Sequence, residues 1–339
     1  MAGDRMTRLT AARIETLARG ALIRHGASEA QARALAAGVA AAELDGLRSH
    51  GLMYLPTYCE HLTCGKVLGQ AEPRPTRPSP AILSVNAGNG FAHAAIAVGL
   101  PPLIETARLQ GVAALAIRNS YNCGALGYHT ERIAQAGLVG LGFTNAPASI
   151  APWGGRKAAI GTNPWSLAVP DGKGGARFVI DQSASVVAKS EVIKRARAGE
   201  PIPAGWAFDA DGETTTDANE ALKGTMAPAG GYKGVGSALL VEIFAACLTG
   251  ANPGLVASPF SGTVGGPPGT GQFFLAVSPG ATSAGAFAGN LETVAGAFAG
   301  DARLPGTKRF AARERNAGEG IEVAPETLAT LEKLAGTAA

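Results

Sequence analysis

The stretch Leu44-Asp45-Gly46-Leu47-Arg48-Ser49-His50-Gly51-Leu52-Met53-Tyr54-Leu55 places a hydroxyl and an imidazole side by side between two segments with helical patterns. Gly46 ends the first segment, and the second runs from about residue 51 to 63 with an apolar seam. If a helix begins near Gly51, its N-terminal partial charge disfavours the imidazolium of His50. A proton-donating His50 then needs a carboxylate partner. The alternative is that Ser49 only caps the helix while His50 bonds to backbone.

Helical patterns precede this stretch and a layered pattern follows it. Residues 10–24 and 28–44 have helical periodicity, and Ser28 and Gln31 have the spacing of a capping box. The Pro-rich segment 72–80 is typical of an extended connector. Short apolar runs then alternate with helical patterns, with candidate strands at 82–85, 112–117, 138–143, 160–169, 178–181 and 273–277 and candidate helices at 91–109, 128–136, 185–197, 235–248 and 284–298. This alternation predicts an α/β layered region after a helical one.

The composition indicates a folded protein with a large core. Of 339 residues, 46% are apolar and 16% are charged. The formal charge of +3 is spread without a Lys/Arg block, so no nucleic-acid partner is expected. Asp4 and Arg8 interrupt any signal-peptide core, and the best apolar run, 235–248, is short and contains Glu242. We therefore expect a cytoplasmic protein with no membrane association.

The four cysteines predict neither a disulfide framework nor a metal centre. Cys59, Cys64, Cys123 and Cys247 are few and scattered, which fits a reducing compartment. Cys59, His61 and Cys64 could chelate a metal in principle. A zinc site needs a fourth ligand, and no second closely spaced pair is present. No metal is expected.

Common nucleotide and nucleophile motifs are missing. Gly-x-Gly occurs at 88–90, 140–142, 234–236 and 269–271, always without the third glycine of the dinucleotide fingerprint. An ordinary Rossmann domain is therefore disfavoured. Lys233 lacks the context of a phosphate-binding P-loop lysine. No Gly-x-Ser-x-Gly elbow supports a serine hydrolase that uses Ser49 and His50.

An ordered set of short motifs covers nearly the whole chain, from about Leu9 to Arg309. The set is LDGLRSHG (44–51), NSYNCGALG (119–127), TNA (144–146), APWGG (151–155), GTNP (161–164), IPAGW (202–206), TTTD (214–217), GGYKG (230–234) and RLPG (303–306). Each motif is weak alone, but the ordered set is highly specific. It resembles the type 2 malate/L-lactate dehydrogenase family, whose members include L-sulfolactate and ureidoglycolate dehydrogenases, 2,3-diketogulonate reductases and Δ1-piperideine-2-carboxylate/Δ1-pyrroline-2-carboxylate reductases.

The resemblance implies an α/β fold unrelated to Rossmann domains, with a mixed sheet that holds NAD(P)H. It also implies a homodimer whose active site lies between domains. Residues 1–75 would form an N-terminal helical region that carries the Ser-His motif and packs with the C-terminal segment. Residues 76–300 would form the mixed α/β cofactor-binding and catalytic region, and residues 301–339 a cofactor-contacting turn and helix.

The resemblance also implies catalytic roles. His50 would be the general acid that protonates a carbonyl oxygen or imine nitrogen, with Ser49 and an acidic residue orienting it. Glu191 matches that acidic position, although a solvated helix residue is the alternative. A carboxylate near His50 would raise its pKa and keep a proton available. Thr162, Lys189 and Ser190 match positions that contact the substrate.

Cofactor contacts carry over to four segments with small residues and backbone amides. These are Asn122, Cys123, Gly124, Ala125 and Leu126; Asp181, Gln182 and Ser183; Tyr232 and Lys233; and Arg303, Leu304, Pro305, Gly306, Lys308 and Arg309. Without the resemblance, Lys233 and Arg303 would be ordinary surface charges. Lys308 and Arg309 could pair with a 2′-phosphate, which favours NADPH, whereas a carboxylate there would favour NADH.

The departures from the family pattern concern the substrate. Many members have arginine where this chain has Tyr54, which offers one neutral hydrogen bond in place of a bidentate ion pair. Arg48 could supply the missing charge. Asn122-Cys123 replaces a histidine and an aromatic residue, and Ser190 replaces a common glycine. The pocket is therefore expected to be reshaped.

The expected activity is NAD(P)H-dependent reduction at the carbon next to the carboxylate of a small-molecule substrate. A cyclic α-imino acid, Δ1-piperideine-2-carboxylate or Δ1-pyrroline-2-carboxylate, suits the apolar surroundings of Met53, Tyr54 and Cys123. The alternative is a 2-hydroxy acid dehydrogenase of the malate, lactate, sulfolactate or ureidoglycolate type. A catalytically silent NAD(P)-binding protein is a more remote alternative.

Overall fold

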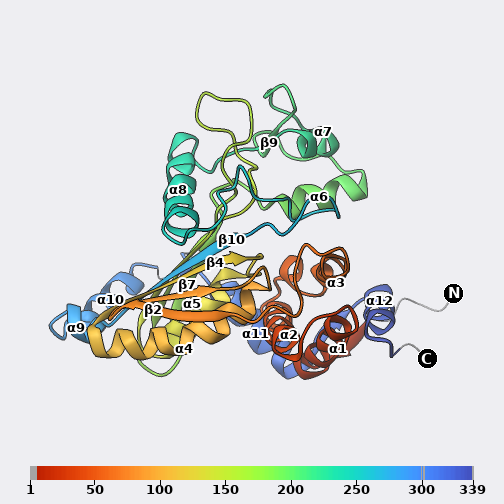
Figure 1. Cartoon of the computed structure of the whole chain (residues 1–339). Helices are drawn as coiled ribbons and strands as arrows, with labels where there is room; N and C mark the ends of the chain where they lie inside the picture. The colour runs from red at the N-terminus through yellow and green to blue at the C-terminus, as the bar shows by residue number, and fades with distance from the viewer. Residues whose placement is uncertain (1–5, 299, 301, 338–339) are drawn as a thin grey trace.

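The computed structural model describes residues 6–298, 300 and 302–337, and it has three parts (Figure 1). A mixed sheet lies at the centre. The N-terminal and C-terminal helices pack together at one end of the sheet, and a smaller lobe of helices and short strands stands above it. Within the described residues, no helix is both long enough and apolar enough to cross a membrane.

The sheet has seven strands in the order β2-β3-β4-β10-β5-β6-β7. Only β3 and β4 pair in parallel, and every other neighbouring pair is antiparallel. The strands are β2 (Arg74–Ser79), β3 (Ile82–Asn86), β4 (Val112–Ser120), β5 (Val139–Thr144), β6 (Trp165–Pro170), β7 (Ala176–Gln182) and β10 (Thr270–Val277). The α/β class with a mixed sheet agrees with the expectation from the sequence.

Apolar residues bury both faces of the sheet. Helices α4 (Ala92–Gln110) and α5 (Leu126–Gln135) cover one face, where Leu115 and Phe274 are fully buried. Helix α8 (Tyr232–Glu242) and the π-helical turn η3 (Ile243–Cys247) cover the other face. Burial on both faces explains why the central strands are nearly continuous apolar runs.

The Pro-rich segment differs from its predicted role as a connector. Residues Arg74–Ser79 form strand β2, which lies at the edge of the sheet and pairs with β3. Proline lacks a backbone donor, and an edge strand is the position in a sheet where a missing donor is tolerated. The exposed side chains of β2 fit this edge position.

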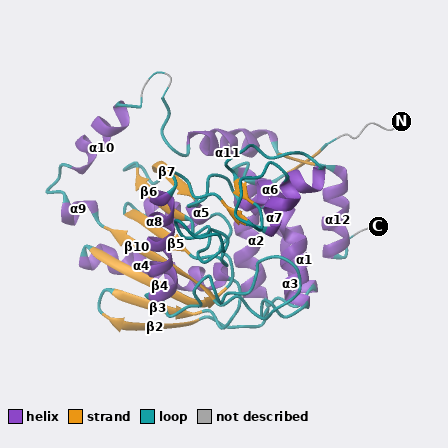
Figure 2. Ribbon diagram, turned by 90° about the horizontal axis from the view of Figure 1, so that it is seen from above, coloured by secondary structure: helices purple, strands orange, loops and turns teal. Residues whose placement is uncertain are grey.

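The two ends of the chain share one apolar core. Helices α1 (Ala11–Arg24), α2 (Glu29–Leu44) and α3 (Leu55–Thr63) pack with the C-terminal helix α12 (Pro325–Ala335). Strand β1 (Thr7–Leu9) pairs with β11 (Ile321–Val323), and helix α11 (Thr307–Glu319) lies against α2. Figure 2 shows these helices gathered beside the sheet.

The start of α2 has only half of the predicted capping box. The Ser28 side chain accepts a hydrogen bond from Gln31 N at 3.3 Å, as expected. The Gln31 side chain does not turn back to the cap. Its amide donates to Ala71 O at 2.7 Å and accepts from Phe91 N at 2.9 Å, so it joins α2 to the start of α4.

The upper lobe contains the connections between the later strands. It includes α6 (Lys189–Ala198), α7 (Ala218–Lys223), β8 (Ala207–Phe208) and β9 (Thr225–Met226) around their own apolar cluster. Helices α9 (Pro279–Thr282) and α10 (Phe287–Gly296) extend beyond the end of β10. Segments of this lobe approach the N-terminal helices from above (Figure 1).

Candidate active site

The Ser-His pair lies in a turn that differs from the predicted helix start. Two short 3-10 turns, η1 (Arg48–His50) and η2 (Leu52–Tyr54), separate α2 from α3, and α3 begins only at Leu55. Pro56 stands in the first turn of α3, where the missing donor is harmless. His50 is therefore not at an α-helix N-terminus. Burial, not the helix dipole, is the main cause of its lowered pKa.

A buried carboxylate fixes this turn from below. Glu43 accepts a hydrogen bond from Leu52 N at 2.6 Å. A Cβ at Gly51 would lie 2.2 Å from Glu43 Oε1, so only glycine fits at this position. Above it, Ser49 Oγ lies 3.0 Å from His50 Nδ1. This contact occupies one ring nitrogen, and among the described contacts Nε2 has no hydrogen-bond partner.

The carboxylate that acts on His50 is Asp181, at the end of β7. Its negative charge raises the pKa of His50 and opposes the larger lowering by burial. Burial raises the pKa of Asp181 in turn, while a hydrogen bond from Gly127 N at 2.7 Å and the charges of His50 and Arg309 lower it. Both side chains keep solvent-accessible surface although protein surrounds them. Both are exposed, so a small molecule can reach the space between them, here called the crevice.

Helix α6 contributes the residues expected at the substrate. Lys189 begins this helix, and burial lowers the pKa of its ammonium although part of the side chain is accessible. Ser190 is exposed beside it. Thr162 is half-buried, and its carbonyl accepts from Ala184 N at 2.8 Å, so it lies beside the loop that leads from the end of β7 to α6.

Glu191 forms ion pairs within its own helix. The Glu191 carboxylate lies 3.8 Å from Lys194 Nζ and 3.5 Å from Arg195 Nε, both on its own helix. Such exposed pairs contribute little to stability. In this arrangement Glu191 pairs with cations of its own helix, and Asp181 is a carboxylate whose charge acts on His50.

Tyr54 faces the loop that follows α8. Its hydroxyl donates to Phe260 O at 2.8 Å, and its ring packs edge-on against Tyr58 with 4.8 Å between centroids. Tyr58 Oη donates to Asn122 Oδ1 at 3.0 Å. Tyr54 and Asn122, the two residues that differ from the family pattern, therefore both contact Tyr58. Sequence reasoning missed Tyr58 and Phe260, because no motif marks them.

Arg48, which could supply the missing charge, lies beside a cavity. This separate cavity of about 420 Å³ is also lined by Glu43, Arg315 and residues of β1 and β11. The positive charge of Arg48 lowers the pKa of Glu43, although burial of that carboxyl raises it more.

The segments expected to bind the cofactor converge around the end of β7. Gly127 N binds Asp181, which places the loop 122–126 beside it. Pro305 O accepts from Val179 N at 3.4 Å, so the turn 303–309 follows the same strand. Ala229 N donates to Ala184 O at 2.8 Å, which brings the N-terminus of α8, with Tyr232 and Lys233, to the next residues of the chain.

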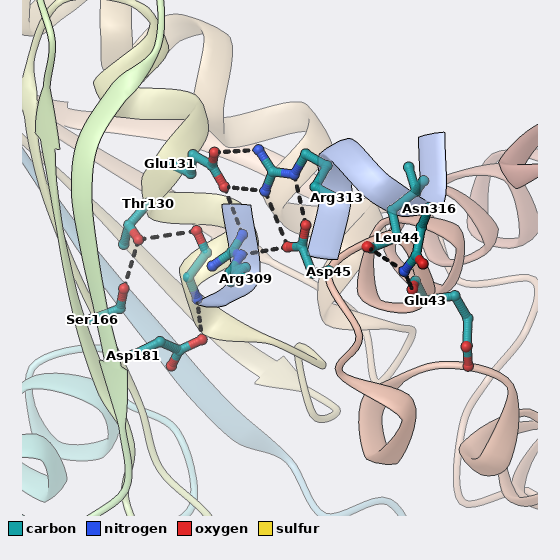
Figure 3. Close-up of polar contacts among 11 residues, drawn as sticks. Glu43, Leu44, Asp45, Thr130, Glu131, Ser166, Asp181, Arg309, Arg313 and Asn316 are labelled. Atoms are coloured by element: carbon teal, nitrogen blue, oxygen red, sulfur yellow. Dashed lines mark hydrogen bonds and ion pairs between the residues drawn. The ribbon is translucent and has the colours of Figure 1, made fainter. Parts of the chain in front are cut away.

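These residues fit a dinucleotide in most respects. Arg303, Lys308 and Lys233 are exposed, and none of them forms an ion pair within the described residues. Cys123 is buried, and burial raises the pKa of its thiol to about 12, so the thiol is neutral. Arg309 is the exception, because it is buried and bound to Asp45 and Glu131 (Figure 3). It cannot pair with a 2′-phosphate in this arrangement.

The residues of the possible chelate are engaged elsewhere. His61 Nδ1 lies 2.5 Å from Tyr121 Oη, and His61 Nε2 lies 3.0 Å from Gly262 O. Cys59 is buried, and burial raises the pKa of its thiol to about 12. Among the described residues, no group of three His, Cys, Asp or Glu side chains is placed to hold a metal ion.

The site has a candidate proton donor, His50, and a carboxylate, Asp181, that acts on it. Beside them lie segments rich in backbone amides, together with exposed cations that suit a dinucleotide. This combination defines a nicotinamide-dependent oxidoreductase. The chain belongs to the malate/L-lactate dehydrogenase family, whose model matches residues 9–332. The protein is thus an NAD(P)-dependent oxidoreductase with the mixed-sheet fold of that family.

Its relatives differ in substrate. The chain is 42% identical over 316 residues to a (2R)-3-sulfolactate dehydrogenase (NADP(+)) from Chromohalobacter salexigens, covering 93% of both chains. It is 39% identical to a Δ1-pyrroline-2-carboxylate reductase from Pseudomonas fluorescens, covering 89% of this chain and 91% of that one. The crystal structure of Δ1-piperideine-2-carboxylate reductase from Pseudomonas syringae pv. tomato superposes with a TM-score of 0.90 at 34% identity, covering 97% and 99%.

Proposed function

We propose that this enzyme reduces a cyclic α-imino acid, Δ1-piperideine-2-carboxylate or Δ1-pyrroline-2-carboxylate, to the L-amino acid with NADPH. The observation that carries this proposal is the hydrogen bond from Tyr54 to Phe260 O. It turns the Tyr54 hydroxyl away from a substrate carboxylate and leaves an aromatic ring where many relatives have a cation. An apolar ring of the substrate suits such a wall better than a second charged group does.

The charges of the crevice support a substrate with one carboxylate. Lys189 is the cation we assign to that carboxylate, because it is an exposed lysine at the start of α6. Arg48 lies in the separate cavity beyond the Ser-His turn. A dianion such as malate or sulfolactate would need a second cation to offset its desolvation.

The residues of the chain then have distinct roles. When bound, the reduced nicotinamide supplies the hydride that adds to the imine carbon. His50 donates a proton to the imine nitrogen, Ser49 holds Nδ1 of its ring, and the charge of Asp181 favours the protonated imidazole against the effect of burial. Lys189, Thr162 and Ser190 orient the carboxylate. Lys308 and Arg303 are the cations we assign to the 2′-phosphate of NADPH, which makes NADH the weaker cofactor.

A second function is favoured by one specific observation. The sulfolactate dehydrogenase relative is 42% identical to this chain, and its substrate is a 2-hydroxy acid. The same His50 and Asp181 could protonate a carbonyl oxygen in place of an imine nitrogen. The class of substrate therefore depends on the apolar surface that the Tyr54 ring provides and on how many cations contact the substrate.

The test follows oxidation of NADPH, and then NADH, by the purified protein. The substrates are both cyclic imines, pyruvate, oxaloacetate and sulfopyruvate, with His50→Gln as the inactive control. We expect rapid oxidation with the imines, at a kcat/KM at least about tenfold above that with any 2-oxo acid. Faster turnover of a 2-oxo acid would move the assignment to a 2-hydroxy acid dehydrogenase. Tight NADPH binding without turnover would indicate a silent binding protein.

A further inference from the structure

Four charged side chains form a cluster between α2, α5 and α11 in which three are buried and Arg313 is partly exposed (Figure 3). Arg309 Nη2 lies 2.6 Å from Glu131 Oε2, and its Nε bonds to Asp45. Arg313 lies 2.6 Å from each of the same two carboxylates. The side chains of Asp45 and Glu131 are 2% and 5% exposed. Their charges therefore depend on the two arginines, because an unpaired buried carboxylate is costly.

The cluster is connected to both members of the catalytic pair. Asp45 caps the end of α2, five residues before His50. Glu131 lies in α5, one helical turn after Gly127. Gly127 N donates to Asp181 Oδ2 at 2.7 Å. Helix α11, from the C-terminal end of the chain, supplies the two arginines that join these segments.

One nitrogen of Arg309 is not used within the cluster. Nη1 is buried, and it has no hydrogen-bond partner in the structure. A Cβ placed at Gly127 would lie 2.5 Å from this Nη1 and 2.8 Å from Asp181 Oδ2. The guanidinium and the catalytic carboxylate therefore meet across the space that the missing side chain of Gly127 leaves open.

Four groups face the Asp181 carboxylate. His50 faces it from η1, Gly127 N from α5, Arg309 from α11 and Cys123 from the loop after β4. The Cys123 thiol is neutral, so His50 and Arg309 are the two charges that lower the pKa of Asp181 against burial. Arg313 is not among these groups, although it shares both carboxylate partners of Arg309.

We propose that Arg309 is a positioning residue for the proposed reaction, and that it holds the Asp181 carboxylate ionised and oriented toward His50. This inference rests on the proposed role of His50 as proton donor. It also assigns a function to helix α11, because displacement of this helix would remove the positive charge of Arg309 from Asp181.

The experiment compares Arg309→Met with Arg313→Met, a control in the same cluster. The first measurement is the titration of the His50 ring protons by NMR in protein without substrate, with the His50 signal identified by its loss in His50→Gln. We expect the midpoint in Arg309→Met to fall by about half a unit or more, because a protonated Asp181 no longer stabilises the imidazolium. The midpoint in Arg313→Met should not move.

The second measurement is the pH dependence of kcat in the reductase assay. In Arg309→Met, we expect kcat to fall about tenfold with little change in KM, and the acid limb to move upward by about one pH unit. The direction follows because Asp181, without the neighbouring cation, takes up a proton at higher pH. If both methionine variants lose Tm and kcat equally, and the titration midpoint of His50 stays the same in both, the cluster is structural only.

Two further outcomes separate the inference from the proposed function. If the titration moves but no substrate is turned over, the positioning role stands and the proposed function fails. If Arg309→Met does not fold, Arg309→Lys replaces it and Arg313→Lys becomes the control. A lysine at 309 cannot reproduce the three nitrogens of the guanidinium, so a midpoint displacement of at least about 0.3 units relative to that control supports the proposal. A smaller displacement contradicts it.

Discussion

The chemistry at the residue scale depends on the protonation of His50. Reduction needs the protonated imidazole, and burial lowers its pKa below the ordinary 6.5 despite the opposing charge of Asp181. The reduction rate should therefore fall as pH rises through a value below 6.5, and the reverse oxidation should rise over the same interval. A pH profile of kcat/KM in both directions measures this. A reduction rate that stays constant from pH 5 to pH 8 would exclude His50 as the proton donor.

Two carboxylates can be compared by single substitutions. Asp181→Asn removes the charge that raises the pKa of His50, whereas Glu191→Gln removes a carboxylate that pairs only with Lys194 and Arg195. We expect Asp181→Asn to lower kcat about 100-fold and Glu191→Gln to lower it less than about threefold. Steady-state kinetics at saturating NADPH provide the comparison. The reverse order would mean that α6 moves during turnover and brings Glu191 to His50.

Tyr54 is a residue at which stability and specificity can be separated. Tyr54→Phe removes the donor to Phe260 O, and leaving that carbonyl unpaired should cost about 1 kcal/mol in urea unfolding. The ring stays in the wall of the crevice, so KM for the imine should change less than about twofold. A large rise in KM would mean that the hydroxyl contacts the substrate. Tyr58→Phe, which loses its bond to Asn122, is the matched control.

At the scale of elements, the sequence predicted the periodic segments well and the irregular ones poorly. Helix α1 and strand β3 begin within a residue or two of the expected positions, because their patterns reflect burial on one or two faces. The split of residues 48–63 into two 3-10 turns and α3 depends on the Glu43 carboxylate beneath Gly51, which no local pattern reveals. Strands β1 and β11 were not expected, since each has three residues and pairs across the whole chain.

The candidate site was predictable to a similar extent. The Ser49–His50 contact is present, and the expected cofactor segments converge in space. The role of Asp181 as partner of His50 could not be read from the sequence, because residue spacing does not show which carboxylate lies across a crevice. The burial of Arg309 was likewise hidden, since its partners are 264 and 178 residues away.

The C-terminal helix α12 offers a test of how the elements stabilise the site. Leu331 is buried in the core formed by α1, α2 and α3. Leu331→Ala should lower the free energy of unfolding by about 3 kcal/mol in urea denaturation. Leu109→Ala, on an exposed face of α4, is the control and should cost less than about 0.5 kcal/mol. Equal effects would mean that α12 does not share the N-terminal core.

At the scale of the whole molecule, one exposed surface is rich in apolar side chains. Exposed side chains follow α8, the turn η3 and the next loop, namely Leu239, Leu240, Ile243, Leu248, Leu255 and Val256. Gly254 N donates to Glu242 Oε1 at 2.6 Å and fixes that loop against the helix, so these side chains adjoin. A patch of this kind marks an interface between proteins. We propose that a second copy of the chain covers it, as the resemblance to the family implies.

The homodimer can be tested by sedimentation velocity over a range of protein concentrations. The wild-type chain should sediment as a dimer at micromolar concentration. Leu240→Glu should shift it toward the monomer, because a buried unpaired carboxylate at the interface costs several kcal/mol. Leu109→Glu places the same charge on an exposed part of α4, outside the patch, and should leave the dimer intact. If the Leu240→Glu and wild-type proteins sediment alike, the apolar surface of α8 is not where two copies meet.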